Sequence, residues 1–242
     1  MTVELRRTHT EGTAAAGRPP VAIVHGPVRR GHAIVLEAGR ITATAPAGIA
    51  LVGSNGSGKS SLHLQLAGVL RTPHPASVRI GGRPAVLAWV PQEPVFPAWL
   101  GVRDVMRMYG FDPDALIAAT TALHLERIAA SRADTLSTGE RQALAIALAL
   151  ARDADVTLLD EPFAALDFQR RSGAIDLLCE RCARGGSFLL SSQSAADLAG
   201  LCDHYVVIRD GRYVFSGTTG DLEALTGTGS GGIERRLLQL LT

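Results

Sequence analysis

The sequence lacks a long apolar run. Its longest uninterrupted stretch of apolar residues, 143–151, is about half the length that a membrane-spanning helix needs. The opening residues, Met-Thr-Val-Glu-Leu-Arg-Arg, also lack the apolar centre of a signal peptide. We therefore expect a soluble chain in the cytoplasm. Its 242 residues, 46% of them hydrophobic, are enough for one sizeable α/β domain.

The chain also lacks an excess of charge of either sign. It has 24 basic and 23 acidic side chains, which gives a net charge of +1. Binding to nucleic acid or to an anionic membrane surface through general electrostatics needs a clear basic excess. We therefore expect no nucleic-acid partner, and any other partner has to be inferred from local sites.

Cysteine is scarce, with three residues, as is usual in a reducing compartment. Cys179 and Cys182 form a C-x-x-C pair, and Cys202 and His204 follow, so four possible zinc ligands are present. The pair lies inside a stretch predicted to be helical, 172–183, and zinc knuckles are turns. We therefore favour ordinary buried thiols over a zinc site.

The most informative stretch is the glycine-rich segment 53–60, which matches the phosphate-binding pattern G-x-x-x-x-G-K-[ST]. A buried strand is predicted before it, at 48–52, and a helix after it, at 61–70. In that context, backbone N–H groups and the helix N-terminus can surround a polyphosphate. We expect Lys59 to pair with the β- and γ-phosphates of a nucleotide and Ser60 to bind Mg²⁺. The other nucleotide-binding residues predicted in this segment are Gly53, Ser54, Asn55, Gly56, Ser57, Gly58 and Ser61.

The sequence before this loop predicts a small β region. Residues 1–20 have no periodicity and are expected to form a mobile tail. Strands are predicted at 21–24 and 33–44 with a turn at 29–32 between them. After the loop and its helix, residues 78–82 predict a hairpin that extends this β region.

Between about residues 93 and 152 the pattern becomes helical, which predicts a helical subdomain inserted in the core. Within it, Leu-Ser-Thr-Gly-Glu at 136–140 precedes an Ala/Leu-rich helix, and Ser137 with Glu140 matches a capping box. Residues 21–226 are expected to form one domain. The last residues, 227–242, are expected to form a flexible link and a short amphipathic helix.

Polar residues follow three of the predicted buried strands. Gln92 follows the strand at 86–90, and Asp160-Glu161 follows the fully apolar strand at 156–159. Gln193 follows a third strand, at 187–191. Parallel sheets place their ligand groups at the carboxyl ends of strands, and two adjacent carboxylates there are costly without a cation. The pattern therefore favours Mg²⁺ beside the phosphate loop.

Taken together in this order, the phosphate loop, Gln92, Leu-Ser-Thr-Gly-Glu, Leu-Leu-Asp-Glu-Pro and Ala-Leu-Asp resemble the ATP-binding cassette (ABC) ATPases. The resemblance covers about residues 21–220. It implies a P-loop NTPase (RecA-like) α/β core with a mostly parallel sheet, a small antiparallel β subdomain and an inserted helical subdomain. It also implies ATP and Mg²⁺ as ligands and hydrolysis of ATP to ADP and phosphate.

The same resemblance assigns roles to single residues. Asp160 would hold Mg²⁺, Glu161 would be the general base, and Gln92 would contact Mg²⁺ and the attacking water. Ser137, Gly139 and Asp167 would face a nucleotide bound by a second ABC ATPase subunit, in a homodimer or a heterodimer. In this arrangement each chain carries two half-sites, and hydrolysis is tied to closure of the dimer.

The sequence departs from the family pattern at several positions. Gln193 stands where the family has a switch histidine. It can donate a hydrogen bond but cannot carry a proton, so slow hydrolysis is expected. Thr138 and Glu140 replace the usual glycine and glutamine of the signature, and the Glu140 carboxylate slightly opposes an incoming phosphate. No aromatic residue stands where the family stacks adenine. His32 is the candidate, with a solvated turn histidine as the alternative.

The function implied is that of the nucleotide-binding subunit of an ABC transporter, peripheral on the inner face of the cell membrane. It would work with separate membrane-spanning subunits. Thr138 and the Leu-Leu-Ser-Ser run at 189–192 favour export. The alternatives are a weakly hydrolytic regulatory cassette paired with an active one, and a soluble ABC ATPase outside transport. The apolar segment 94–102 is expected either to meet the membrane partner or to pack inside the helical subdomain.

Overall fold

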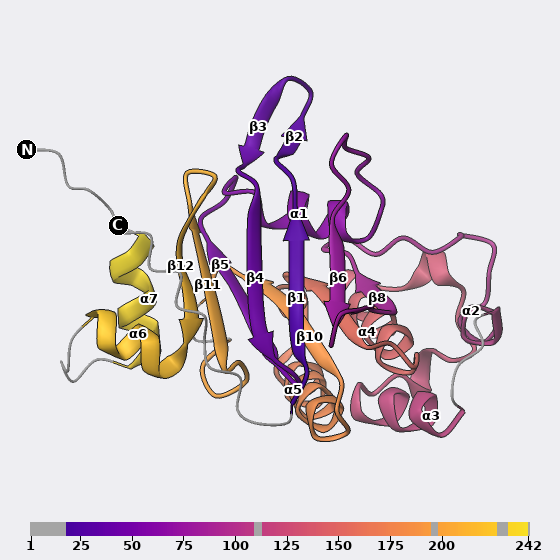
Figure 1. Cartoon of the computed structure of the whole chain (residues 1–242). Helices are drawn as coiled ribbons and strands as arrows, with labels where there is room; N and C mark the ends of the chain where they lie inside the picture. Colours follow the sequence, from indigo (N-terminus) through magenta and orange to yellow (C-terminus); the bar gives the residue numbers. More distant parts are fainter. Residues whose placement is uncertain (1–17, 109–112, 195–197, 227–231, 242) are drawn as a thin grey trace, which may run out of the picture.

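A six-stranded sheet forms the centre of the computed structural model, which describes residues 18–108, 113–194, 198–226 and 232–241 (Figure 1). The strand order is β12-β11-β5-β10-β9-β8, and only the edge strand β12 runs antiparallel to its neighbour. The strands are β5 (Gly48–Gly53), β8 (Leu87–Val90), β9 (Val156–Asp160), β10 (Ser187–Ser192), β11 (His204–Arg209) and β12 (Arg212–Thr218). The predicted α/β class with a mostly parallel sheet is confirmed.

Three neighbouring strands of this sheet, β5, β10 and β9, are buried along their whole length. Strands covered on both faces read as continuous apolar runs and do not alternate with polar residues. The pairing aligns the ends of the three strands: Ser191 on β10 lies beside Leu51 of β5 on one side and beside Asp160 of β9 on the other. The carboxyl ends of the three strands therefore meet at one place.

A second sheet, of order β4-β1-β6-β7, is antiparallel, as predicted for the small β subdomain. Its strands are β1 (Pro20–His25), β4 (Gly39–Thr44), β6 (Ser77–Ile80) and β7 (Arg83–Pro84). A separate hairpin joins β2 (Val28–Arg30) to β3 (Ala33–Leu36). The predicted single strand at 33–44 is wrong, because its first half pairs with β2 and its second half with β1.

The two faces of the central sheet carry separate apolar cores. On one face, α1 (Lys59–Leu66) and the small antiparallel sheet cover Leu51 and Leu158. On the other face, α4 (Thr138–Leu150) and α5 (Phe168–Ala183) cover Leu159 and Leu190. Alternate residues along one strand thus belong to different cores, as the two-residue period of a strand requires. α1 ends at Leu66, earlier than predicted.

The helical region contains α2 (Val102–Met108), α3 (Pro113–Ala122) and two 3₁₀ turns, Glu126–Ile128 and Ala133–Thr135. α4 packs on both α3 and β8, so it joins the helical region to the sheet. The predicted capping box is confirmed: Ser137 Oγ accepts from Glu140 N at 3.2 Å, and the Glu140 carboxylate accepts from Ser137 N at 2.8 Å. These bonds fix where α4 begins.

The C-terminal part adds two helices beside β11 and β12, α6 (Thr219–Thr226) and α7 (Ile233–Leu241), at the left of Figure 1. The final helix was predicted, and α6 was not. The predicted tail up to residue 17 and the link at 227–231 lie outside the described residues. None of the described helices is long and apolar enough to cross a membrane.

The cysteines occupy three different environments. Cys202 is buried, Cys182 is half-buried and Cys179 is exposed, so the prediction of buried thiols is wrong for Cys179. The reason is the helix itself: residues 179 and 182 lie on α5, whose outer face is in solvent. In the described part of the chain, no group of three or more His, Cys, Asp or Glu side chains could hold a metal ion.

Candidate active site

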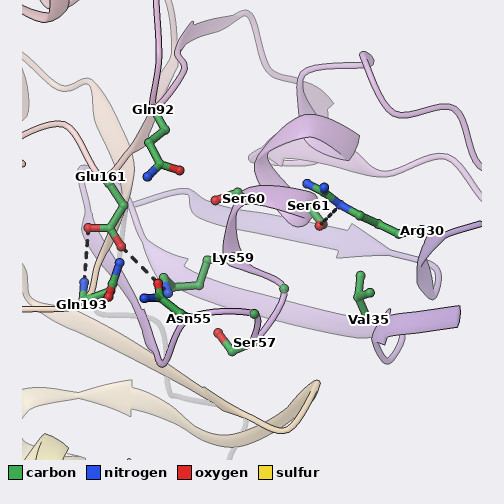
Figure 2. Close-up of a pocket in the computed structure, with 12 residues that line it drawn as sticks. Arg30, Val35, Asn55, Ser57, Lys59, Ser60, Ser61, Gln92, Glu161 and Gln193 are labelled. Carbon is green, nitrogen blue, oxygen red and sulfur yellow. Dashed lines mark hydrogen bonds and ion pairs between the residues drawn. The ribbon is translucent and has the colours of Figure 1, made fainter. Parts of the chain in front are cut away.

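A cavity of about 290 Å³ opens at the carboxyl ends of β5, β9 and β10 (Figure 2). It brings together most of the residues predicted to bind nucleotide and to catalyse hydrolysis. The lining consists of Arg30, Val35, Asn55, Gly56, Ser57, Gly58, Lys59, Ser60, Ser61, Gln92, Glu161 and Gln193. Segments that are far apart in the sequence therefore face one space.

The floor of the cavity is the loop between β5 and α1. Gly58 has φ 106°, a left-handed conformation, and a Cβ there would lie 2.9 Å from the backbone oxygen of Val35. Only glycine is compatible with both constraints. The helix begins directly afterwards, with Leu62 N donating to Gly58 O at 2.9 Å. The first N–H groups of α1 consequently point toward the cavity, where an anion would be stabilised.

Lys59 is folded back on its own loop. Its Nζ donates to the backbone oxygens of Gly53 at 2.7 Å and Ser54 at 3.1 Å, and it lies 3.9 Å from Glu161 Oε1. Burial lowers the pKa of Lys59, while the charges of Glu161 and Asp160 raise it. The hydrogen-bond partners of the ammonium group are thus two neutral carbonyl oxygens. Charged phosphate oxygens would bind it more strongly and can take their place.

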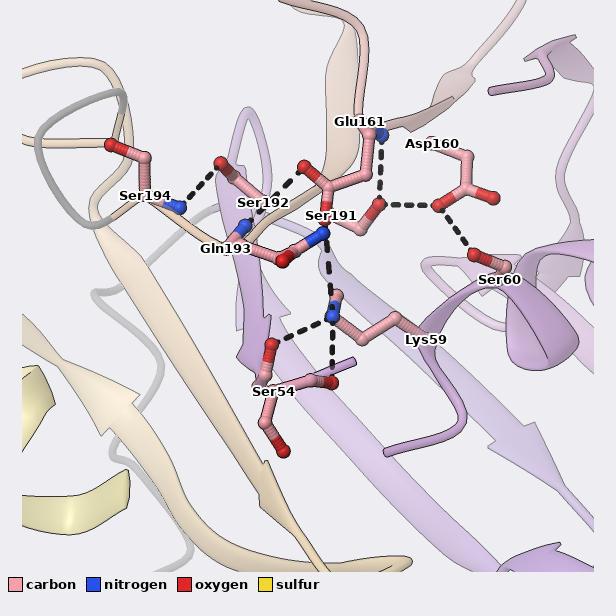
Figure 3. A network of polar contacts seen from close by, with 10 residues as sticks. Ser54, Lys59, Ser60, Asp160, Glu161, Ser191, Ser192, Gln193 and Ser194 are labelled. Atoms are coloured by element: carbon pink, nitrogen blue, oxygen red, sulfur yellow. Dashed lines mark hydrogen bonds and ion pairs between the residues drawn. The ribbon is translucent and has the colours of Figure 1, made fainter. Parts of the chain in front are cut away.

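The carboxylate of Asp160 joins two other elements. Its Oδ1 accepts from Ser60 Oγ at 3.1 Å and from Ser191 Oγ at 2.6 Å (Figure 3). Hydroxyl, carboxylate and amide oxygens are the ligands that Mg²⁺ prefers. Ser60 and Asp160, with Gln92 across the cavity, therefore form a donor set that fits this ion.

Glu161 has an unusual backbone conformation, with φ 47°. Its N–H donates to Ser191 Oγ at 3.0 Å and to Ser191 O at 3.2 Å, and its Oε2 accepts from Gln193 N at 3.3 Å. The buried Oε1 has no hydrogen bond. Burial raises the pKa of the Glu161 carboxyl, while the charge of Lys59 lowers it. An oxygen held in place with a free lone pair is suited to accept a proton from water.

Three residues of the site were not predicted from the sequence. Arg30 and Val35, on the hairpin β2–β3, line the end of the cavity beyond Ser61, and Arg30 Nε donates to Ser61 Oγ at 3.1 Å. Ser191 holds both Asp160 and Glu161. The pairing of β10 with β9 places Ser191 beside Asp160, and a serine inside an apolar strand was the only sequence signal for it.

Other predicted residues lie away from the cavity. His32 is exposed in the turn between β2 and β3, and it does not line the cavity; this placement fits the alternative of a solvated turn histidine. Ser137, Gly139 and Asp167 do not line it either. They belong to the adjoining starts of α4 and α5, where a Cβ on Gly139 would lie 2.6 Å from the backbone oxygen of Ala165.

A strand, a glycine loop and a helix that face two carboxylates on a neighbouring strand define a P-loop nucleotide hydrolase. The family model described as ABC transporter matches residues 40–164, which include the loop and both carboxylates. This chain belongs to the ABC transporter family, as an ATP-binding subunit.

Two relatives illustrate the similarity. The chain is 35% identical to the manganese transport system ATP-binding protein MntA of Synechocystis sp., over 72% of this chain and 72% of that protein. It is 34% identical to the aliphatic sulfonates import ATP-binding protein SsuB of Corynebacterium glutamicum, over 84% of this chain and 86% of that protein.

Solved structures share the fold. One described as the structure of the ATP binding subunit of an ABC transporter has a TM-score of 0.78 at 23% identity. The match covers 91% of this chain and 98% of that chain. A bacterial Atm1-family ABC exporter with ATP bound has a TM-score of 0.73 at 20% identity, with 93% of this chain and 42% of that chain covered. The fold therefore occurs in an ATP-binding subunit of an ABC transporter and in an exporter.

The role of Ser191 can be tested by Ser191→Ala. The change removes a hydroxyl from a fully buried position and leaves Asp160 with one donor fewer. We expect the free energy of unfolding to fall by about 1–3 kcal/mol, measured by urea denaturation. The Mg²⁺ concentration needed for half-maximal ATP binding should rise several-fold. Ser194→Ala, at an exposed position just beyond the same strand, is the matched control. Equal behaviour of the two variants would contradict the assignment.

Proposed function

We propose that this subunit binds and hydrolyses ATP with Mg²⁺ in a head-to-tail dimer and thereby drives transport through separate membrane-spanning subunits. The observation that carries the proposal is the position of two adjacent carboxylates. Asp160, at the end of β9, accepts a hydrogen bond from Ser60, and Glu161 lines the same cavity as Lys59 and Ser60. Two adjacent carboxylates, of which Asp160 is buried, are costly beside a phosphate loop unless positive charge is near, and a cation bound with the nucleotide would supply it.

The chemistry follows from the residues that surround the cavity. On ATP binding, Lys59 exchanges the carbonyl oxygens of its loop for phosphate oxygens. Ser60, Asp160 and Gln92 would hold Mg²⁺, which neutralises charge on the phosphates when bound. Glu161 accepts a proton from water through Oε1, while its other oxygen stays bonded to Gln193 N. Such a site works mainly by positioning groups and neutralising charge.

The dimer part of the proposal is supported by the starts of α4 and α5. Ser137, Gly139 and Asp167 lie at the N-termini of these helices and outside the chain's own cavity. A helix N-terminus favours an anion, and the phosphates of a nucleotide on a second subunit would supply it. Two such chains, or this chain and a different ABC subunit, would complete two sites.

The surface proposed for the membrane partner lies in the segment 94–102. Val95 is 88% exposed and Trp99 is 76% exposed, while Leu100 is buried and Phe96 is half-buried. Leu100 thus packs inside the subunit, and the exposed Val95 and Trp99 are the side chains that we propose meet the partner. Val95 and Phe96 also line a shallow groove of about 210 Å³ with Trp89 and residues of α4. Exposed large apolar side chains beside a groove are typical of a protein interface. The partner would hold the subunit at the inner face of the cell membrane.

The direction of transport is where the sequence and the relatives differ. Thr138 and the run at 189–192 led to a preference for export. The relative from Corynebacterium glutamicum is named for import, as are several others, for thiamine, ribose and hemin. These names support import, and we propose import as the direction.

The regulatory alternative, a weakly hydrolytic cassette paired with an active one, rests on Gln193, which lines the cavity and cannot carry a proton.

Dimerisation can be tested with Glu161→Gln. The amide keeps the shape of the side chain but cannot accept the proton, so ATP should bind and remain intact. We expect sedimentation velocity to show a dimer with ATP and a monomer without it. Lys59→Ala in the same background should remove both ATP binding and the dimer. A monomer under saturating ATP would exclude the homodimer and leave the heterodimer with a different ABC subunit.

The partner surface can be tested with Trp99→Ala. We expect the variant to lose association with the membrane subunits, measured by co-purification, and to retain ATP binding and thermal stability as an isolated subunit. Leu225→Ala is the matched control, because Leu225 is also exposed, at 59%, but lies on α6. Loss of ATP binding in the Trp99 variant would instead indicate a role in folding.

The position of Gln193 generates a kinetic prediction. The loss of one hydrogen-bond donor from a transition state costs on the order of a hundredfold in rate, and a neutral donor in place of a better one should cost about tenfold. Gln193→His should therefore raise the turnover number of the assembled complex about tenfold, with little change in apparent affinity for ATP. A flat or lower rate would mean either that Gln193 is not at the switch position or that hydrolysis occurs mainly at a partner's site, and the second outcome would favour the regulatory alternative.

A further inference from the structure

Arg170, in the first turn of α5, contacts the N-cap of its own helix and two other segments. Its Nε donates to the backbone oxygen of Leu123 at 3.2 Å, and its Nη1 donates to Asp167 Oδ2 at 3.1 Å. Its Nη2 lies 3.8 Å from Glu140 Oε1. The side chain is 18% exposed, so these contacts are partly shielded from water. The planar guanidinium carries five N–H donors in fixed directions on three nitrogens, so it can reach partners that lie farther apart than the single nitrogen of a lysine can.

The backbones around Arg170 are in unusually close contact. A Cβ on Gly173 would lie 2.0 Å from the backbone oxygen of Ala122, and one on Gly139 would lie 2.6 Å from that of Ala165. Glycine at these two positions lets α5 approach the end of α3, and lets α4 approach the turn before α5. Arg170 lies where these three segments meet, and its contacts tie them together.

Glu140 places a negative charge where the three segments meet. Its Oε2 accepts from Ser137 N and from Ser137 Oγ, each at 2.8 Å, which leaves Oε1 for Arg170. The hydrogen bonds from Ser137 lower the pKa of Glu140, and Arg170 acts in the same direction. A carboxylate is therefore charged at neutral pH beside the residues proposed to face a phosphate, and it needs a nearby positive charge.

We propose that Arg170 is a positioning residue that holds residues 137–140 and Asp167 as one unit and offsets the charge of Glu140 where a nucleotide on a second subunit would approach. This inference rests on the proposed ATP-dependent dimer. It also explains how a subunit with glutamate in its signature can accept an anion there. The bond to Leu123 O connects the unit to the helical region, so a displacement of that region would move the signature residues and Asp167 together.

The test is a double-mutant cycle in the full-length Glu161→Gln protein. Arg170→Met should leave binding of a fluorescent ATP analogue to the monomer unchanged and weaken ATP-dependent dimerisation about three- to tenfold, as expected for partly shielded ion pairs. Addition of Glu140→Gln should recover most of this loss, because the uncompensated carboxylate is gone. Arg184→Met is the matched control, since Arg184 is the C-cap residue of the same helix and pairs with Glu180 in solvent.

Two results would overturn the proposal: dimerisation of Arg170→Met equal to that of the parent, or a loss that Glu140→Gln does not reduce. Arg170→Lys serves as a second variant if Arg170→Met folds poorly, and it should fall between the parent and the methionine variant. If the parent itself stays monomeric with ATP, the proposed homodimer fails, and hydrogen exchange in the monomer decides the role of Arg170. Faster exchange of Arg170→Met in both 137–141 and 165–169 supports it, and unchanged exchange in both overturns it.

Discussion

The carboxylate of Asp160 is the point on which the rest of the site depends. It is 3% exposed, and a buried charge of this kind is stable only when donors surround it. Ser60 comes from the first turn of α1 and Ser191 from β10, so the two donors are on different elements. A shift of one residue in the pairing of β9 with β10 would turn Ser191 to the other face. The need to satisfy one charge thus fixes the register of the sheet at the place where the chemistry occurs.

The parts predicted well were those with local signals. The glycine loop, the apolar strands that end in polar residues and the capping box of Ser137 and Glu140 are each written in a few consecutive residues. Two features depend instead on which strand pairs with which. They are the break between β3 and β4, and the presence of Arg30, Val35 and Ser191 in the site. That information is tertiary, because residues of β10 become neighbours of Asp160 only through the parallel pairing of the two strands. The direction of transport is not fixed by this fold either, because a relative by sequence is named for import while an exporter shares the fold.

The net charge of this protein is close to zero, but charged side chains of opposite sign are grouped at particular sites. Around the cavity, the positive charges of Lys59 and Arg30 lie near the negative charges of Glu161 and of Asp160, which is bonded to Ser60. At the start of α4, Arg170 and Glu140 repeat this balance on a smaller scale. In both places a group that would repel the ligand is matched by one that attracts it. The sequence composition hides this arrangement, because opposite charges cancel in the sum.

The central place of β5 bears on how the protein is synthesised. β5 carries the phosphate loop, yet both of its partners in the sheet, β10 and β11, are encoded near the other end of the chain, as the pairing of Ala50 with Leu190 and with Tyr205 shows. A ribosome adds about 5–20 residues per second, so the loop would wait on the order of ten seconds or more before either partner emerges. During that interval ATP has no formed cavity to bind and cannot stabilise the nascent chain. An apolar strand left unpaired for so long is a natural target for chaperones.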